Sequence, residues 1–365
     1  MKAEGGMTIT QQRLLNQKLV ASDLRTPLEI VSWLGVVQSQ DYAGAKWALA
    51  LRSPGLRDAD VERACDEGGI LRTHILRPTW HFVAPEDLRW MQQLAGPRLK
   101  TANSHYCRKS GLDGKTLAKS RRIIERALRD RNYLTRTALG DVLARNGIKG
   151  DTLHLAYLVM DCEIDHVICS GPRQGKQSTY ALVDERAPKQ RRLAGDEALA
   201  ELTRRYFTSH GPATVHDFAW WSGLTIGHAK RGLEALGKGM VSKTVNDVTY
   251  WSAPAKARRA RGAGKQPTVI LLPNYDEYLN ALKDRSLALD PLGAPATMGA
   301  FIGVPHQLVI DGILRGAWRR VTTGKTVKIA VKPFRPLSKK EKDSLADAVA
   351  WHGEFLGLPA TFTVA

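Results

Sequence analysis

Hydrophobic and polar positions along the chain repeat one pattern three times: two or three amphipathic helices, then two short alternating stretches joined by a turn. In the first copy Thr26 caps a helix that Pro27 begins, and a further helix starts at Asp58 or Asp60. Residues 70–83 then alternate as two strands. Helices followed by such a strand pair are typical of winged-helix units.

The second copy shows the same order more clearly. Its three helices and its hairpin are expected at 116–130, 135–147, 151–164 and 166–183. The hairpin loop GPRQGKQ carries two cations, Arg173 and Lys176, where the wing of such a unit touches phosphates. A plain solvated hairpin tip is the alternative interpretation.

The third copy contains a helix-turn-helix signature. Residues 213–224 end in a glycine turn, and residues 225–236 begin the next helix at once. The stretch 240–253 supplies the two strands of the wing. Trp220 and Trp221 are both expected in the core.

The remainder of the chain predicts a small β-domain. Residues 255–266 place five Lys or Arg residues in a Gly/Ala-rich stretch, which indicates a flexible basic linker or an ordinary solvated loop. Strand-like stretches follow, and a helix is expected from about 338 to 356. The expected fold class is therefore α+β, with three tandem winged-helix units plus a β-rich C-terminal part with a terminal helix. The expected divisions are 1–110, 111–190, 191–255 and 256–365.

Charge is the strongest feature of the composition. The 365 residues contain 54 Lys and Arg against 36 Asp and Glu, which is a formal net charge of +18. Such an excess indicates a polyanionic partner, with nucleic acid as the first candidate. An anionic membrane surface is the second candidate, but no long basic amphipathic helix with an apolar face supports it. A basic metabolic enzyme is a further alternative.

Other features narrow the functional class. No run of 18 apolar residues could span a bilayer, and the N-terminal sequence lacks the apolar core of a secretory signal, so the cytoplasm is the expected compartment. The four cysteines form no C-x-x-C pair, which argues against a structural zinc site and a disulfide framework. Local motifs for nucleotide hydrolysis, zinc proteolysis, ester hydrolysis and zinc-dependent deamination are missing. Neither a cofactor nor a metal is expected.

Two polar clusters have structural interpretations. His74 and His81 have no third ligand at metal spacing, so packed or hydrogen-bonded histidines are expected rather than a metal site. Asp276 and Glu277, in the run NYDEYLNALKDR, could serve acid–base chemistry. A structural ion network that ties the β-domain to a helical unit is the favoured interpretation.

Two glutamines in the stretch GVVQSQDYAG are harder to explain. Gln38 and Gln40 follow an apolar segment, and buried amides need hydrogen-bond partners. On a helix, positions two apart point about 200° away from each other, so the pair can address one site only where a helix ends or the chain is extended. Gly44 predicts that a helix ends near the pair. A capping or solvated role is the alternative.

Five stretches together resemble the bacterial winged-helix DNA-binding proteins that include the AlkZ-like DNA glycosylases. They are VVQSQDYAGAKWALALR (36–52), LRPTWHFVAPEDLRW (76–90), GPATVHDFAWWSGL (211–224), LLPNYDEYLNALKDRS (271–286) and VIDGILRGAWRR (309–320). The resemblance covers nearly the whole chain. It implies tandem winged helices arranged as a concave DNA-binding platform with a β-rich C-terminal part.

The resemblance also implies a catalytic motif. In that family the motif is Gln, an apolar residue and Gln, and it falls here on Gln38, Ser39 and Gln40. A related branch carries Asp at the last position and acts on simpler cationic adducts. Ser39 departs from the apolar centre of the motif. Asp41 is a candidate supporting residue, and a helix cap or a surface charge is the alternative for it.

The implied activity is that of a monofunctional DNA glycosylase for N7-alkylated purines, including bulky adducts or interstrand crosslinks. Such a purine already carries positive charge, so it leaves without a general acid, and the remaining barrier is an oxocarbenium-like sugar and the addition of water. Neutral amides can place that water through preorganised dipoles. Without a lysine nucleophile, the product would be an abasic site in an uncut strand.

Double-stranded DNA, bound largely without sequence preference, is the partner that fits the charge. Candidate phosphate contacts are Arg72, Arg77, Arg173, Lys176, Arg258 and Arg259. A monomer suffices, and an open cleft is expected because a crosslinked base cannot enter a snug pocket. The alternative is a non-catalytic winged-helix DNA-binding protein or transcriptional regulator, which would prefer one operator sequence.

Overall fold

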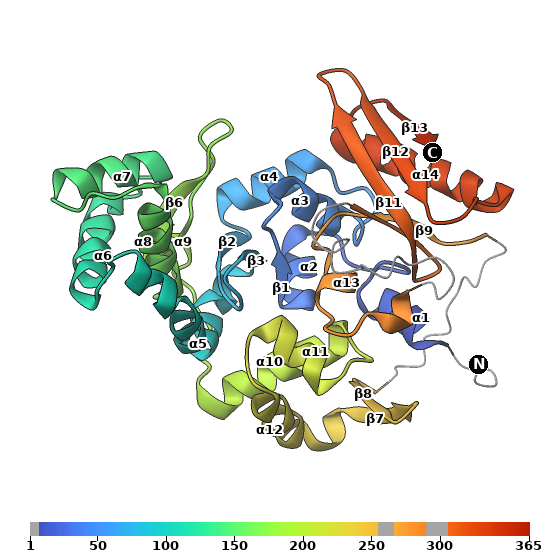
Figure 1. The fold of residues 1–365 in the computed structure, drawn as a ribbon, viewed down its shortest axis with the longest axis horizontal. Helices are drawn as coiled ribbons and strands as arrows, with labels where there is room; N and C mark the ends of the chain where they lie inside the picture. Colours follow the sequence, from blue (N-terminus) through green and yellow to red (C-terminus); the bar gives the residue numbers. More distant parts are fainter. Residues whose placement is uncertain (1–6, 255–265, 290–305) are drawn as a thin grey trace.

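The computed structural model describes residues 7–254, 266–289 and 306–365. They form a mixed α+β fold, as the sequence predicts. Figure 1 places the first repeat at the centre, the second beside it at the left, the third below, and the C-terminal sheet with its helix at the upper right.

The first repeat follows a short N-terminal helix. The elements are α1 (Ile9–Asn16), α2 (Pro27–Leu34), β1 (Val36–Gln38), α3 (Tyr42–Ala50), α4 (Asp58–Glu67), β2 (Leu71–His74) and β3 (Trp80–Val83). Strand β3 lies between the other two, so the sheet order is β1-β3-β2. Thr26 caps α2 in a capping box with Glu29, which confirms the predicted start of this helix.

The second repeat follows a connecting helix and has the same topology. A 3-10 turn (Pro85–Asp87) and α5 (Leu88–Lys109) precede α6 (Gly114–Leu128), β4 (Leu134–Thr135), α7 (Arg136–Arg145), α8 (Thr152–Ile164), β5 (Ile168–Ser170), β6 (Thr179–Leu182) and α9 (Val183–Arg186). The sheet order is β4-β6-β5, so the first strand again pairs with the last. The predicted helices and hairpin of this repeat are confirmed.

The third repeat keeps this order with a shorter first strand. It contains α10 (Gly195–Ser209), α11 (Val215–Ser222), α12 (Ile226–Leu236), a 3-10 turn (Gly237–Gly239), β7 (Val241–Val245) and β8 (Val248–Ser252). A bridge from Ala213 to Trp251 of β8 takes the place of the first strand. Gly223 turns the chain between α11 and α12 at a φ of 69°, and a Cβ there would lie 2.4 Å from a backbone carbonyl oxygen, so glycine is required. Trp221 is buried as predicted, but Trp220 is 45% exposed, so the core prediction is wrong for Trp220.

The C-terminal part is one five-stranded sheet with a helix. Its elements are β9 (Val269–Leu272), α13 (Glu277–Asn280), a 3-10 turn (Ser286–Ala288), β10 (His306–Ile310), β11 (Ile313–Thr322), β12 (Val327–Pro333), α14 (Lys339–Leu356) and β13 (Ala360–Val364). The sheet order is β13-β12-β11-β10-β9. Helix α14 confirms the helix expected at about 338–356, and Ser338 caps it. The sequence pattern did not predict β13, which pairs in parallel with β12.

Three hydrophobic cores hold these elements together. The first packs α2 and α3 against the C-terminal sheet and α14, the second packs the first sheet against α5 and the third repeat, and the third lies within the second repeat. Strand β1 lies between two of them, because Val37 belongs to the first core and Val36 to the second. The strand that carries the first glutamine is therefore fixed from both sides.

Neither the described helices nor the cysteines suggest a membrane-spanning segment or a disulfide. No helix within the described ranges is long and apolar enough to cross a bilayer. The four cysteines are free thiols, and three of them are buried. Burial raises the pKa of the Cys65 thiol to about 11, which leaves it protonated and unreactive at neutral pH.

A buried histidine in α14 makes the fold sensitive to acid. The side chain of His352 is 0% exposed and packs 4.7 Å from the Trp47 ring. Nη1 of Arg320 lies 3.0 Å from its Nε2, and because a guanidinium only donates, this nitrogen must be an acceptor. Burial, together with Arg320 and His306, lowers the pKa of His352 to about 3. The folded protein therefore holds the neutral imidazole.

We expect His352 to lower the free energy of unfolding by about 2 kcal/mol between pH 7 and pH 5. The reason is that this side chain is protonated below about pH 6.5 in the unfolded chain but stays neutral in the folded one. Urea titrations at the two pH values would measure the difference. His352→Gln keeps an acceptor for Arg320 and does not titrate, so it should shrink the difference by that amount. His105→Gln, on the exposed end of α5, is the control. An unchanged difference in His352→Gln would contradict the assignment.

Candidate active site

Gln38 is the last residue of β1, and Gln40 lies two residues beyond it in a bend. The ladder continues for one residue beyond β1, because the backbone N–H of Ser39 donates to the carbonyl oxygen of Trp80 at 2.7 Å. The side chain of Gln40 reaches the backbone of Trp80 in β3. The predicted helix end near Gly44 is wrong: α2 ends before β1, and Gly44 lies in the first turn of α3. The chain is extended at Gln38 and bends at Gln40.

Gln38 is buried and hydrogen-bonded through both its side chain and its backbone. Only 6% of the residue is exposed. Its Oε1 accepts from Nη2 of Arg77 at 2.9 Å and from Nδ2 of Asn280, and its backbone N–H donates to Oε1 of Glu277 at 2.8 Å. Burial lowers the pKa of Arg77, while the carboxylate of Glu277 acts in the opposite direction. Gln38 is therefore a rigid group rather than a surface side chain.

Gln40 is, in contrast, exposed. Its Oε1 accepts one long hydrogen bond, 3.3 Å from the backbone N–H of Trp80. A carbonyl oxygen has a second lone pair, so this amide can still accept a hydrogen from a ligand or a water molecule. The pair therefore combines one fixed amide with one that faces solvent.

Ser39, between the two glutamines, occupies a buried position. The side chain is 0% exposed, and its hydroxyl has no hydrogen-bond partner among the described residues. A buried hydroxyl without a partner costs about 1–3 kcal/mol. The position therefore suits an apolar side chain.

Replacing Ser39 with Ala is expected to leave the free energy of unfolding unchanged or to raise it by up to about 1 kcal/mol. Urea titration would measure this. Ser222→Ala is the matched control: Ser222 is equally buried, but its hydroxyl donates to the carbonyl oxygen of Phe218 at 2.7 Å, so its loss should destabilise by about 1 kcal/mol. A larger loss in Ser39→Ala than in the control would contradict this account.

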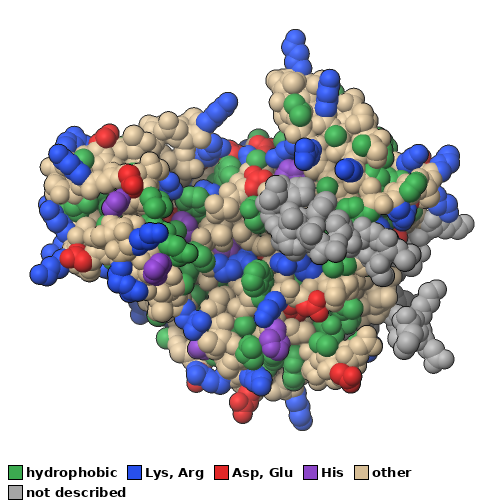
Figure 2. All heavy atoms as spheres, in the orientation of Figure 1, with side chains coloured by type: hydrophobic (Ala, Val, Ile, Leu, Met, Phe, Trp, Pro, Cys, Tyr) green, Lys and Arg blue, Asp and Glu red, His purple; other side chains and the backbone are tan. Residues whose placement is uncertain are grey.

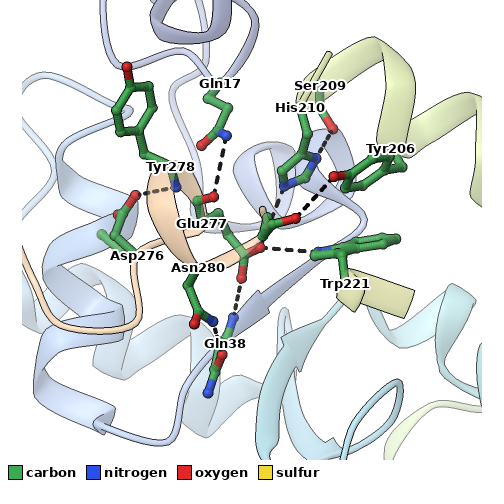
Figure 3. A network of polar contacts seen from close by, with 12 residues as sticks. Gln17, Gln38, Tyr206, Ser209, His210, Trp221, Asp276, Glu277, Tyr278 and Asn280 are labelled. Carbon is green, nitrogen blue, oxygen red and sulfur yellow. Dashed lines mark hydrogen bonds and ion pairs between the residues drawn. The ribbon is translucent and has the colours of Figure 1, made fainter. Parts of the chain in front are cut away.

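A buried carboxylate, that of Glu277, contacts the backbone of Gln38 (Figure 3). Glu277 is 0% exposed and accepts from the backbone N–H of Gln38 and from the indole of Trp221 at 3.1 Å. Burial alone would raise its pKa, but His210, Arg77 and the Gln38 backbone outweigh burial and lower it to about 2. Nε2 of His210 lies 3.5 Å from Oε2 of Glu277, and burial lowers the pKa of His210, while Glu277 acts in the opposite direction. At neutral pH we therefore expect an ionised Glu277 beside a neutral imidazole.

The neighbouring Asp276 is part of a buried ion pair. Both its oxygens accept from Arg52, at 2.9 Å each, and both side chains are 0% exposed. Asp276 also caps α13 by accepting from the backbone N–H of Tyr278. Since neither Asp276 nor Glu277 reaches the surface, the interpretation as a structural ion network is confirmed over the one as an acid–base pair.

The two histidines of the first sheet are hydrogen-bonded, as predicted. Nδ1 of His74 lies 2.5 Å from Oε2 of Glu163, and Nδ1 of His81 lies 2.8 Å from the carbonyl oxygen of Thr79. Burial, with Arg77 nearby, lowers the pKa of His81 to about 3. Within the described ranges no group of three His, Cys, Asp or Glu side chains could hold a metal ion.

Arg72 contacts the motif from β2, on the far side of β3. Its guanidinium donates to the carbonyl oxygen of Ser39 at 3.0 and 3.2 Å and lies over the Trp80 ring, 4.4 Å from the centroid. Tyr42 packs on it as well. Arg72, Trp80 and Tyr42 line a cavity of about 30 Å³ between the first and second repeats. That volume admits a water molecule and excludes a purine.

The remaining predicted contacts lie apart from the glutamines or outside the described residues. Arg173 pairs with Glu62 at 2.8 Å, while Lys176 is exposed at the tip of the β5–β6 hairpin. Arg258 and Arg259 fall in residues 255–265, outside the described ranges. Asp41 caps α3 by accepting from the backbone N–H of Gly44 at 3.1 Å, which matches the capping alternative.

Sequence reasoning missed the residues that orient Gln38. Asn280 was not singled out, and Glu277 was interpreted as part of an ion network or an acid–base pair, not as a partner of Gln38. Asn280 is 242 positions from Gln38 along the chain, so no local spacing links the two. The only available signal was the concentration of polar residues in NYDEYLN next to a predicted strand.

Comparison with known proteins places this site in a family. Residues 31–355 match the DNA glycosylase AlkZ-like family. An interstrand DNA cross-link repair glycosylase of Streptomyces sahachiroi is 23% identical over 341 residues, which cover 84% of each chain. The structure of S. sahachiroi DNA glycosylase AlkZ superimposes with a TM-score of 0.76 at 20% identity, over 97% of this chain and 98% of that one.

The matched region includes both glutamines, α13 and most of the C-terminal sheet. It covers well over half of the chain. This protein therefore belongs to the AlkZ-like DNA glycosylase family.

Proposed function

We propose that this protein is a monofunctional DNA glycosylase that hydrolyses the N-glycosidic bond of N7-alkylated purines, with Gln38 and Gln40 positioning the attacking water. The observation that carries this proposal is that one buried, hydrogen-bonded amide, Gln38, and one exposed amide, Gln40, both border β3 at the end of β1. Family membership supports the class of reaction.

The chemistry needs no general acid at the departing base. An N7-alkylated purine leaves with its positive charge neutralised, so the enzyme has to stabilise the oxocarbenium-like sugar and deliver water. The nearest carboxylate to Gln38 is Glu277, which is buried and already hydrogen-bonded. No lysine contacts either glutamine within the described part of the chain, which supports a mechanism without a covalent intermediate.

Bulky adducts or interstrand crosslinks are the proposed substrate class. The similar S. sahachiroi protein is named for interstrand DNA cross-link repair. The exposure of Gln40 supports an open site that an adduct still attached to the opposite strand could approach.

Duplex DNA would bind across the repeats without reading its sequence. We interpret the three repeats as winged-helix units over 1–110, 111–190 and 191–255, with residues 256–365 as the β-rich part. Figure 2 shows Lys and Arg side chains spread over the whole visible face rather than confined to one repeat, in keeping with the net charge of +18. Among the candidate phosphate contacts, Lys176 is exposed, whereas Arg72, Arg77 and Arg173 are engaged by Ser39, Gln38 and Glu62. Arg258 and Arg259 remain candidates from the sequence. A single copy, acting on chromosomal DNA in the bacterial cytoplasm, would suffice.

The test is a base-excision assay on two substrates. Duplexes containing 7-methylguanine and duplexes joined by an N7-linked purine crosslink are incubated with the protein and then heated in alkali, which cuts abasic sites. Alkali-dependent breaks in either substrate, with no breaks before heating, are expected. Folded protein that binds both duplexes and yields no breaks in either would refute the proposal.

A further inference from the structure

The contacts of the Gln38 amide decide which way it points. Arginine has only N–H donors, so the Gln38 atom that lies 2.9 Å from Nη2 of Arg77 must be the carbonyl oxygen. Asn280 approaches the same oxygen, and it therefore donates through Nδ2. Both lone pairs of Oε1 are then occupied. This oxygen is not available to a water molecule or to a substrate.

The amide nitrogen of Gln38 points out of the network. Figure 3 shows Nε2 directed away from Asn280 and Glu277, and no described residue accepts a hydrogen bond from it. The NH₂ group can only donate. Gln40 is the opposite case, since its carbonyl oxygen accepts a single long bond from Trp80 and keeps a free lone pair.

We propose that Asn280 and Arg77 are positioning residues that hold Gln38 as a hydrogen-bond donor, and that Gln40 is the acceptor for the attacking water. This inference rests on the proposed hydrolysis and deepens it. The Gln38 NH₂ group donates to one lone pair of the water oxygen, and the Gln40 carbonyl accepts one of its hydrogens. The second lone pair of the water is thereby directed at the anomeric carbon. The water proton passes to bulk solvent once the C–O bond has formed.

Helix α13 is built to keep this arrangement fixed. Asp276 caps the helix and pairs with the buried Arg52, which anchors its first turn. Glu277 then binds the backbone N–H of Gln38, and Asn280, one turn later, binds its side chain. A single four-residue helix therefore fixes both the backbone and the amide of Gln38.

The test compares two substitutions of Asn280 in single-turnover excision. Asn280→Ala leaves Arg77 to hold the oxygen, so we expect a loss of about tenfold in rate. Asn280→Asp keeps the size but offers only acceptors, so it repels the Gln38 carbonyl oxygen that Arg77 holds and draws the NH₂ group away from the water. This should slow excision by on the order of 10²-fold, with the affinity for duplex DNA unchanged in both variants. Asn16→Asp removes the donor of a comparable hydrogen bond to Gly211 and should leave the rate unchanged.

Combination with Gln38→Ala separates positioning from structural support. If Asn280 acts through Gln38, neither Asn280 substitution slows the Gln38→Ala variant further, since the group that it orients is gone. A further slowing in that background, or equal rates for Asn280→Ala and Asn280→Asp, would overturn the inference. Full activity of Gln38→Ala would instead overturn the proposed function itself, so the two failures are distinguishable.

A second pair of variants tests the same roles without touching α13. Gln38→Glu removes the donor while keeping a partner for Arg77, and Gln40→Glu keeps an acceptor. Excision by Gln38→Glu should be as slow as by Gln38→Ala, whereas Gln40→Glu should stay within about tenfold of the unmodified protein. The reverse order would overturn the assignment of donor and acceptor.

Discussion

Gln40→Ala is expected to slow excision of an N7-alkylated purine by on the order of 10²–10³-fold, because it removes a preorganised dipole from the attacking water. The side chain is exposed and makes one long hydrogen bond, so the melting temperature should not change. Gln38→Ala is expected to lose as much rate. It should also lose about 1–3 kcal/mol of stability, because the donors of Arg77 and Asn280 are left buried without an acceptor.

Single-turnover excision, duplex binding and thermal unfolding separate these effects. Gln93→Ala is the control, since Gln93 is an exposed glutamine on α5 outside the network in Figure 3. The mechanism predicts that only the chemical step fails in Gln40→Ala, with binding of undamaged duplex intact. Full-speed excision by this variant would show that its amide does not place the water.

The repeats could be read from the sequence because their signals are local. Thr26, Thr214 and Ser338 each cap a helix through a contact three residues away, and Gly223 marks the turn of the helix-turn-helix. Such signals involve only residues close together in the sequence, so they do not depend on tertiary contacts. The three-residue strand β1 has no such mark, so its apolar positions were assigned to the preceding helix.

The orientation of the Gln38 amide could not be predicted from the sequence, because it depends on contacts between segments that are distant along the chain. The motif itself was found from its resemblance to a family, and the structure shows one buried and one exposed amide at the end of β1. The partners of Gln38 come from β2–β3 and from α13, and their positions follow from how three hydrophobic cores meet at β1. Trp220 and Trp221 show the same limit: identical neighbours on one helix differ in burial because only one of them faces the second core.

The anchor of α13 should dominate stability in this region. All five N–H donors of Arg52 are used: two reach Asp276, two reach Gln17, and one reaches the carbonyl oxygen of Ala48. The pair lies where the first repeat meets the C-terminal part, and both side chains are fully buried. Removing one partner leaves the other as an uncompensated charge in the interior.

Arg52→Met is therefore expected to lower the free energy of unfolding by about 3–5 kcal/mol, measured by urea titration at pH 7. The double variant Arg52→Met/Asp276→Leu should recover much of this loss, since an apolar pair of similar volume needs no desolvation of charge. Lys339→Met breaks an exposed pair with Asp343 and should change stability by less than about 1 kcal/mol. If Arg52→Met cost no more than Lys339→Met, the buried pair would not anchor α13, and the rigidity inferred for Gln38 would need another source.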